Sequence, residues 1–177
     1  MRRTHLGALV LAMGLCIAPA LRAQAQPTEG IRFGFGAGPT LPIGNYGDFD
    51  KMGYNVTGVL QMPISQSAWH LRIDVQYSQT SHDGAPGNTT LFGTTVDGLL
   101  HLGGRAASAR PYILGGLGLY NVDAGGGNQA KLAFGFGGGF LFGMSGLNAF
   151  VEARYMSVQT SGSSLSFVPI TFGLMFK

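Results

Sequence analysis

Hydrophobic and polar residues alternate along most of the chain after residue 30. The clearest stretch is WHLRIDVQYSQ at 69–79, where every odd position from Trp69 to Tyr77 is apolar or aromatic and every even position from His70 to Ser78 is polar. Successive side chains of a β-strand point to opposite faces, so a period of two indicates a strand with two unlike faces.

Seven further segments alternate in the same way, and no useful helical period appears after residue 30. Each has about ten residues, the length that a tilted membrane-spanning strand requires. The eight predicted strands are 30–40, 53–62, 68–78, 90–102, 111–121, 131–142, 147–157 and 165–176. The sequence therefore predicts an all-β fold, an eight-stranded antiparallel up-and-down β-barrel.

The connections between the predicted strands differ in length and composition. Those after the odd-numbered strands are polar or glycine-rich, and they cover 41–52, 79–89, 122–130 and 158–164. The others are mostly shorter, and they cover 63–67, 103–110 and 143–146. Short periplasmic turns and longer outer loops are typical of outer-membrane barrels. We therefore expect both ends of the barrel domain on the periplasmic side.

Two kinds of barrel fit the alternation, and they place the apolar face of the sheet on opposite sides of the barrel wall. A soluble lipocalin-like barrel would pack its apolar face into a core, whereas a transmembrane barrel turns that face to lipid. In the segment 131–142, Phe134 and Phe136 alternate with Gly135 and Gly137. Glycine weakens a strand and gains nothing in water, but it suits a crowded interior. The glycines therefore favour the transmembrane barrel.

This assignment places charged residues of both signs inside the barrel. Ion pairs are expected among them, because an unpaired buried charge costs several kcal/mol. The predicted lumen charge network comprises Arg32, Arg72, Asp74, Asp97, Glu152 and Arg154. Arg72 and Asp97 stand at similar height on neighbouring strands, so we predict that they pair. Such an interior is a closed polar plug rather than a wide pore.

Aromatic residues recur eight positions apart on three of the strands. Eight residues of a tilted strand climb roughly 20 Å, close to the height of the apolar band of membrane barrels. Rings at both ends of such a band form interfacial girdles. The predicted aromatic girdle comprises Trp69, Tyr77, Tyr112, Tyr120, Phe134 and Phe142.

The N-terminal segment has the three parts of a secretory signal peptide. Arg2 and Arg3 precede the apolar run 6–20, and Ala23-Gln24-Ala25 forms a cleavage site. We expect residues 1–25 to be a signal peptide and residues 26–177 to be the barrel domain. Removal of residues 1–25 would take away Cys16, the single cysteine, and the surplus of positive charge. The domain then has no thiol chemistry and no basic surface for nucleic acid.

The chain resembles the small eight-stranded outer-membrane barrels of Gram-negative-type bacteria, similar to the OmpA transmembrane domain, OmpX and the opacity-type surface antigens. Three local stretches carry the resemblance: RPYILGGLGLY at 110–120, FVEARY at 150–155 and FVPITFGLMF at 167–176. It implies a bacterial outer-membrane protein, monomeric and surrounded by outer-membrane lipid. It also implies a last strand that the barrel assembly machinery reads, through Phe172, Gly173, Leu174 and Phe176.

The predicted function is a structural or surface-interaction role through four extracellular loops, with a surface ligand as a possible partner. A small barrel enzyme acting on membrane lipid is the alternative, and Ser81-His82-Asp83 is its one candidate triad. Adjacent residues rarely form a triad, so we expect no catalytic site. Asp48 and Asp50 offer too few oxygens for calcium, and we expect no metal and no cofactor.

Overall fold

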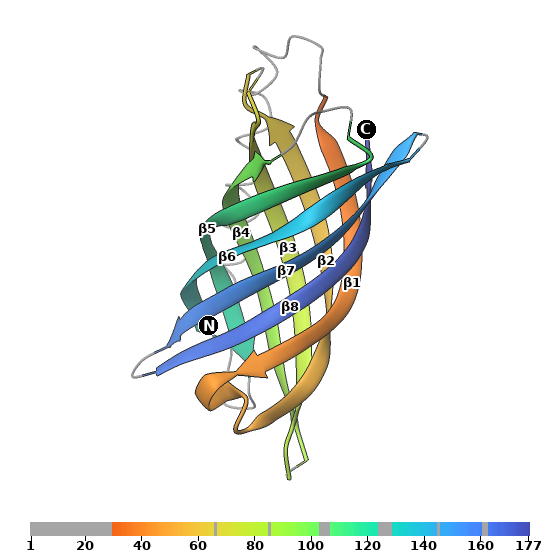
Figure 1. Cartoon of the computed structure of the whole chain (residues 1–177). Helices are drawn as coiled ribbons and strands as arrows, with labels where there is room; N and C mark the ends of the chain where they lie inside the picture. The colour runs from red at the N-terminus through yellow and green to blue at the C-terminus, as the bar shows by residue number, and fades with distance from the viewer. Residues whose placement is uncertain are drawn as a thin grey trace, which may run out of the picture. The chain divides into compact units, whose positions relative to one another are not determined.

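Eight antiparallel strands follow one another around a closed barrel in chain order, β1 to β8, which confirms the predicted fold (Figure 1). The computed structural model describes residues 30–65, 67–84, 86–102, 107–123, 129–144, 146–160 and 163–177, so the predicted signal peptide 1–25 lies outside the described residues. The strands are β1 (Arg32–Ile43), β2 (Asp50–Pro63), β3 (Trp69–His82), β4 (Asn88–His101), β5 (Ala109–Asp123), β6 (Gln129–Met144), β7 (Leu147–Thr160) and β8 (Ser163–Phe176). A short 3-10 helix, η2 (Gly44–Tyr46), follows β1.

The strands are staggered, and the stagger decides which side chains meet inside. Following the strand register once around the barrel from Arg32 returns to β1 at Pro42, ten residues further along. The path runs through Gln61, Arg72, Asp97, Gly116, Gly135, Met156 and Phe167. A barrel with this shear has strands tilted by roughly 40°. Halfway around, two residues in register therefore differ in height by about five residues.

The two faces of the sheet are as unlike as the alternation predicts. On β6 the phenylalanines point outward, and Phe136 is 60% exposed. Gly135 and Gly137 alternate with them and face the interior, where a side chain on either would collide with Met156 or Arg154. Exposed aromatic and aliphatic side chains lie on the outer wall of β1 to β5 and of β8 as well. The outer surface is thus apolar around the middle of the barrel.

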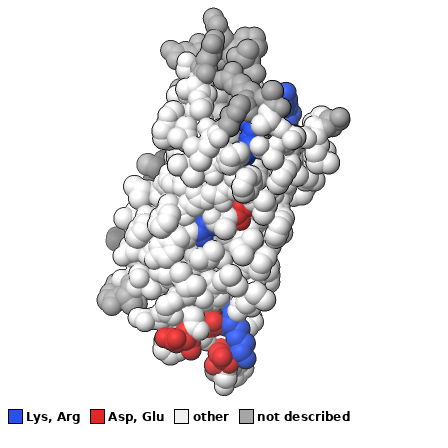
Figure 2. Space-filling view, in the orientation of Figure 1, with Lys and Arg blue, Asp and Glu red and all other residues white. Residues whose placement is uncertain are grey.

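Charged side chains on the visible face gather mainly at one end of the barrel (Figure 2). We call this end the η2 end, and β1, β3, β5 and β7 finish there. We call the opposite end, where β1 begins and β8 finishes, the termini end. Asp48, Lys51, Asp83 and Asp123 are exposed near the η2 end. Lys51 Nζ lies 2.8 Å from Asp83 Oδ1.

The connections at the η2 end are shorter than the sequence predicts. β3 continues to His82, β5 to Asp123 and β7 to Thr160, so only 44–49, 83–87, 124–128 and 161–162 lie between strands there. At the termini end the connections are 64–68, 102–108 and 145–146. The prediction of long loops at one end is therefore wrong, because polar residues that read as loop extend the strands. Within the described ranges, no helix has the length and apolar character needed to cross a membrane.

Candidate functional site

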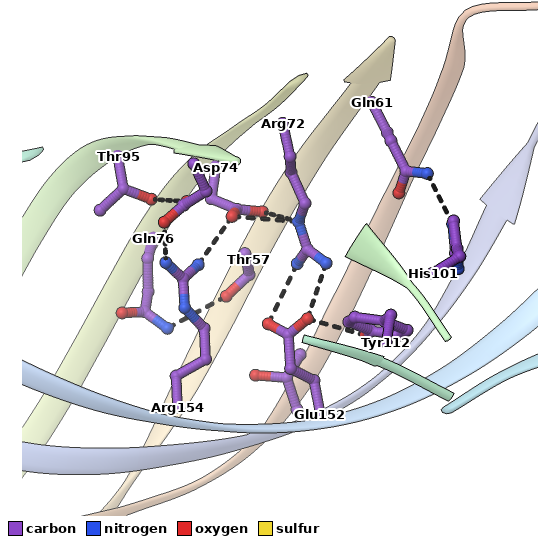
Figure 3. A network of polar contacts seen from close by, with 12 residues as sticks. Thr57, Gln61, Arg72, Asp74, Gln76, Thr95, His101, Tyr112, Glu152 and Arg154 are labelled. Atoms are coloured by element: carbon purple, nitrogen blue, oxygen red, sulfur yellow. Dashed lines mark hydrogen bonds and ion pairs between the residues drawn. The ribbon is translucent and has the colours of Figure 1, made fainter. Parts of the chain in front are cut away.

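Arg72 lies at the centre of an ion network that crosses the barrel interior (Figure 3). The residue is 1% exposed, and its Nε donates to Asp74 Oδ1 at 2.9 Å on the same strand. Its two terminal nitrogens donate to both oxygens of Glu152 on β7, at 2.7 and 3.1 Å. Tyr112 adds a hydrogen bond of 2.7 Å from its hydroxyl to Glu152 Oε2. The Arg72–Glu152 pair is bidentate, the geometry that fixes an arginine and a carboxylate most firmly.

Arg154 joins two more carboxylates to the same network. Its Nη1 donates to Asp74 Oδ2 at 2.7 Å, and its Nη2 donates to Asp97 Oδ1 at 2.6 Å. Thr95 donates to the other oxygen of Asp97 at 2.7 Å. Asp74 is therefore shared by both arginines, which links β3, β4 and β7 through buried charges. Each carboxylate of the network contacts an arginine, as a buried charge requires.

The ten-residue stagger explains these partners. The register connects Arg72 to Met156 and Asp74 to Val158 on β7, four strands away. Because β7 lies halfway around the barrel, the residues at the same height as Arg72 and Asp74 stand about five positions earlier on β7 than these register partners. Those positions are close to Glu152 and Arg154. The predicted Arg72–Asp97 pair is wrong for this reason: the two residues are opposite each other in the register, but Asp97 pairs with Arg154 and Arg72 pairs across the bore.

The sixth residue predicted for the network, Arg32, lies inside the barrel near the termini end. It is 7% exposed at the start of β1, and its register partner is Gln61. Gln61 Nε2 lies 3.4 Å from His101 Nε2, and the rings of His101 and His70 contact each other edge to face. All six predicted residues thus line the interior, and five of them form the ion network described above.

Two of the predicted girdle residues face the wrong way. Tyr112 and Tyr120 are 3% and 2% exposed and point into the barrel, so the girdle assignment is wrong for both. The two faces of β5 are both apolar, because Ile113 and Leu117 alternate with Leu114 and glycines, and the pattern does not distinguish inside from outside. Each hydroxyl has a polar partner in the interior: Tyr112 bonds Glu152, and Tyr120 donates to Gln76 Oε1 at 2.8 Å.

The other predicted outer residues do lie on the outer wall. Trp69, Phe134 and Phe142 are exposed, and Tyr77 is partly exposed beside Tyr54. On β8 the predicted assembly residues Phe172, Leu174 and Phe176 also point outward, and Gly173 faces inward against the ring of Phe150. Recognition of these β8 residues by assembly machinery stays a prediction.

Apolar side chains fill the interior on both sides of the ion network. The cluster toward the η2 end consists of Tyr46, Leu91, Tyr120, Ala133, Met156, Val158 and Phe167. The cluster toward the termini end consists of Val59, Leu99, Tyr112, Leu114, Leu141, Phe150 and Met175. The Arg72 guanidinium lies 5.6 Å from the centre of the Phe150 ring. The charges are thus enclosed between two apolar layers, which lower the local dielectric and strengthen the pairing.

Inward-facing glycines make room for the largest side chains of the interior. Gly93 stands beside Tyr120 in the register, and a Cβ on Gly93 would collide with the Tyr120 ring. Gly139 stands in the same relation to Tyr112, and Gly173 to Phe150. In a barrel of eight strands the interior is only wide enough to be filled, so a bulky residue needs a small neighbour.

This arrangement predicts different effects for an inward-facing and an outward-facing glycine substitution. Gly93→Ala should lower the free energy of unfolding by about 1–3 kcal/mol, because the added methyl group overpacks the interior against Tyr120. Gly115→Ala is the control, since Gly115 faces outward and its Cβ would have its nearest neighbour at 3.5 Å. We expect the control to be neutral or slightly stabilising in urea unfolding in lipid vesicles. Equal losses at both positions would contradict the assignment of the faces.

A second polar cluster closes the interior at the η2 end. Tyr46 and Thr80 share a hydrogen bond of 2.6 Å between their hydroxyls, and Thr80 donates to Asp50 Oδ2 at 2.5 Å. Burial raises the pKa of Tyr46 to about 12. His82 Nε2 lies 3.8 Å from Asp50 Oδ1. The cluster holds η2 against β2 and β3.

The Ser81-His82-Asp83 sequence is divided between separate contacts. His82 Nε2 lies 3.2 Å from Thr89 Oγ1, whereas Asp83 pairs with Lys51. Ser81 points outward at the end of β3 and is exposed. Asp50, one of the two acidic residues considered for calcium, is buried against Thr80, and Asp48 is exposed. In the part of the chain that the structure describes, no group of three or more His, Cys, Asp or Glu residues could hold a metal ion.

Comparisons with known proteins bear on the fold alone. No family model matches the sequence, and no curated protein shows significant similarity. Among solved structures, Neisserial surface protein A is 17% identical over 84% of this chain and 97% of its own, with a TM-score of 0.65. A major outer membrane protein from Thermus thermophilus is 10% identical over 84% and 99%, with a TM-score of 0.52.

The outer membrane enzyme PagL is a weaker match, with 15% identity, coverage of 84% of this chain and 99% of its own, and a TM-score of 0.49. Neisserial surface protein A and the Thermus thermophilus protein each match over 84% of this chain, which forms a closed antiparallel barrel of eight strands. The chain therefore has the fold of the small eight-stranded outer-membrane β-barrels.

Proposed function

We propose that this protein is a resident of the bacterial outer membrane with a closed, charge-paired lumen and a structural or surface-interaction role. The observation that carries the proposal is the filled interior. Arg72, Arg154 and their three carboxylates lie between two apolar clusters, where a wide pore would need a continuous water-filled path. The apolar outer wall supports lipid as the surrounding medium.

The proposal includes a route to the membrane and an orientation in it. Residues 1–25 would direct export and be removed, and the barrel assembly machinery would read the end of β8. The η2 end would face the cell exterior, because polar and charged residues extend its strands beyond the apolar wall. A surface ligand, if one binds, would contact this end. We further propose that the barrel is monomeric. We also propose that it has no catalytic role, since His82 and Asp83 have separate partners and Ser81 points outward.

Membrane fractionation and gel mobility test the location. We expect the mature chain to remain in the outer-membrane fraction after a carbonate wash, and to migrate differently on gels before and after boiling in detergent. The expected reason is that the closed strand ladder of a transmembrane barrel stays paired in detergent until the sample is heated. A chain that stays soluble without detergent after export would contradict the proposal and favour the soluble lipocalin-like alternative.

Conductance in planar lipid bilayers tests the closed lumen. We expect no steady current steps of the size that wide pores give, because side chains fill the bore from the η2 cluster to the termini-end cluster. A sustained open level in the unmodified protein would contradict a closed lumen while leaving its membrane location intact.

A further inference from the structure

The ladder between β1 and β8, which closes the barrel, is interrupted at one place. Cα pairing runs from Phe33↔Phe176 to Ala37↔Phe172 and resumes in the same register at Thr40↔Pro169. The ladder between β7 and β8 has a similar gap, between Ala153↔Ile170 and Met156↔Phe167. Proline has no N–H to donate to a ladder. The two gaps therefore coincide with Pro39 on β1 and Pro169 on β8.

The side chain of Asn55 lies across the first gap. Asn55 is on β2, fully buried, and stands opposite Gly38 of β1 in the register. Its Nδ2 donates to three backbone oxygens: Gly38 O at 3.1 Å, Pro39 O at 2.9 Å and Ile170 O at 3.3 Å. Its Oδ1 accepts a hydrogen bond of 2.9 Å from Thr171 Oγ1 on β8. One carboxamide thus connects three consecutive strands of the barrel.

The chemistry of the gap accounts for these contacts. By the register on both sides, Pro39 stands opposite Ile170, and a proline nitrogen donates nothing to the Ile170 oxygen. A buried carbonyl without a donor is costly, because it has lost its hydrogen bond to water and gained none in the protein. Asn55 supplies the donor. It reaches β8 because Gly38, its neighbour on β1, has no side chain, and a Cβ there would collide with the Ile170 oxygen.

We propose that Asn55 is a clasp that holds the β1–β8 seam closed where Pro39 interrupts its ladder. The clasp controls local opening of the seam in the half of the barrel nearer the η2 end, and with it the contact between the lipid face and the interior. Loss of the clasp leaves the remaining ladders intact, so the seam opens before the rest of the barrel.

Hydrogen exchange of the folded barrel in detergent micelles tests the clasp. Asn55→Leu keeps the size of the side chain and removes both its donor and its acceptor. We expect backbone exchange in 40–43 and 165–172 to become at least tenfold faster, while exchange in 91–99, on the continuous β4–β5 ladder, stays unchanged. Asn121→Leu, the same change at an exposed position of β5, should alter neither region.

A cross-link provides the rescue. Residues 30–177 contain no cysteine, and Leu41 and Val168 are paired across the seam beyond the gap. A disulfide between Leu41→Cys and Val168→Cys in the Asn55→Leu background should restore slow exchange. Thr171→Val, which removes only the hydroxyl on Asn55 Oδ1, should give a smaller increase in the same two segments, and it serves if Asn55→Leu does not fold. Unchanged exchange at the seam, or equal acceleration in all strands, would overturn the proposal.

Discussion

Replacing Arg72 with methionine should lower the free energy of unfolding by about 3–5 kcal/mol, because it leaves buried carboxylates without their cation. Arg72 supplies the bidentate partner of Glu152 and one of the two partners of Asp74. Asp74 keeps Arg154, whereas among the described residues the hydrogen-bond partner left to Glu152 is the hydroxyl of Tyr112. Urea unfolding in lipid vesicles, followed by Trp69 fluorescence, measures the change.

A double variant separates loss of the pair from general damage. In Arg72→Met with Glu152→Gln, the uncompensated charge at position 152 is gone, and Tyr112 still has an oxygen to bond. We expect the double variant to be more stable than Arg72→Met alone, so that the two substitutions are strongly non-additive. Additive effects would show that the two side chains do not depend on each other in the folded barrel.

Replacing Ile73 with arginine should lower the free energy of unfolding by about 2–4 kcal/mol in a lipid bilayer. Ile73 lies on the outer face at the middle of β3, between Trp69 near the termini end and Tyr77 toward the η2 end. A charge there would be in hydrocarbon or would have to draw water and headgroups toward it. Unfolding in urea from lipid vesicles measures the loss.

Ser81→Arg is the matched control for Ile73→Arg. Ser81 is on the same strand and the same face, but it is exposed near the η2 end, level with Lys51. A charge at the edge of the apolar band costs about 0–1 kcal/mol. Equal costs at positions 73 and 81 would mean that lipid does not cover the middle of the outer wall.

The sequence predicts the eight strands, and it predicts which face of a strand points inward wherever the two faces differ in polarity. On β3, polar and apolar residues alternate without a break, and His70, Arg72 and Asp74 are all buried in the structure. On β5 both faces are apolar, so the pattern does not indicate that Tyr112 and Tyr120 point into the barrel. Polarity is informative about orientation only when lipid and lumen select different residue types.

The partners of the lumen charges needed the structure, because they depend on a property of the whole sheet. Neighbouring strands suggest Arg72 and Asp97 as partners, and the register does place them opposite each other. The contacts actually formed run from β3 and β4 to β7, at a height set by the ten-residue stagger. The strand ends were missed for another reason. Beyond the apolar wall, at the η2 end, both faces of the strands are polar, so the extensions of β3 and β7 resemble loops in the sequence.

The placement of Arg72 and Glu152 four strands apart affects how the protein assembles. In a flat, open sheet the two strands would be about 19 Å from each other. At that distance the electrostatic attraction between the two charges is weak. An incomplete sheet therefore carries solvated charges that oppose its entry into lipid. Arg72 and Glu152 meet only when the sheet curls and closes, so in the proposed membrane setting we expect insertion and closure of the barrel to be coupled.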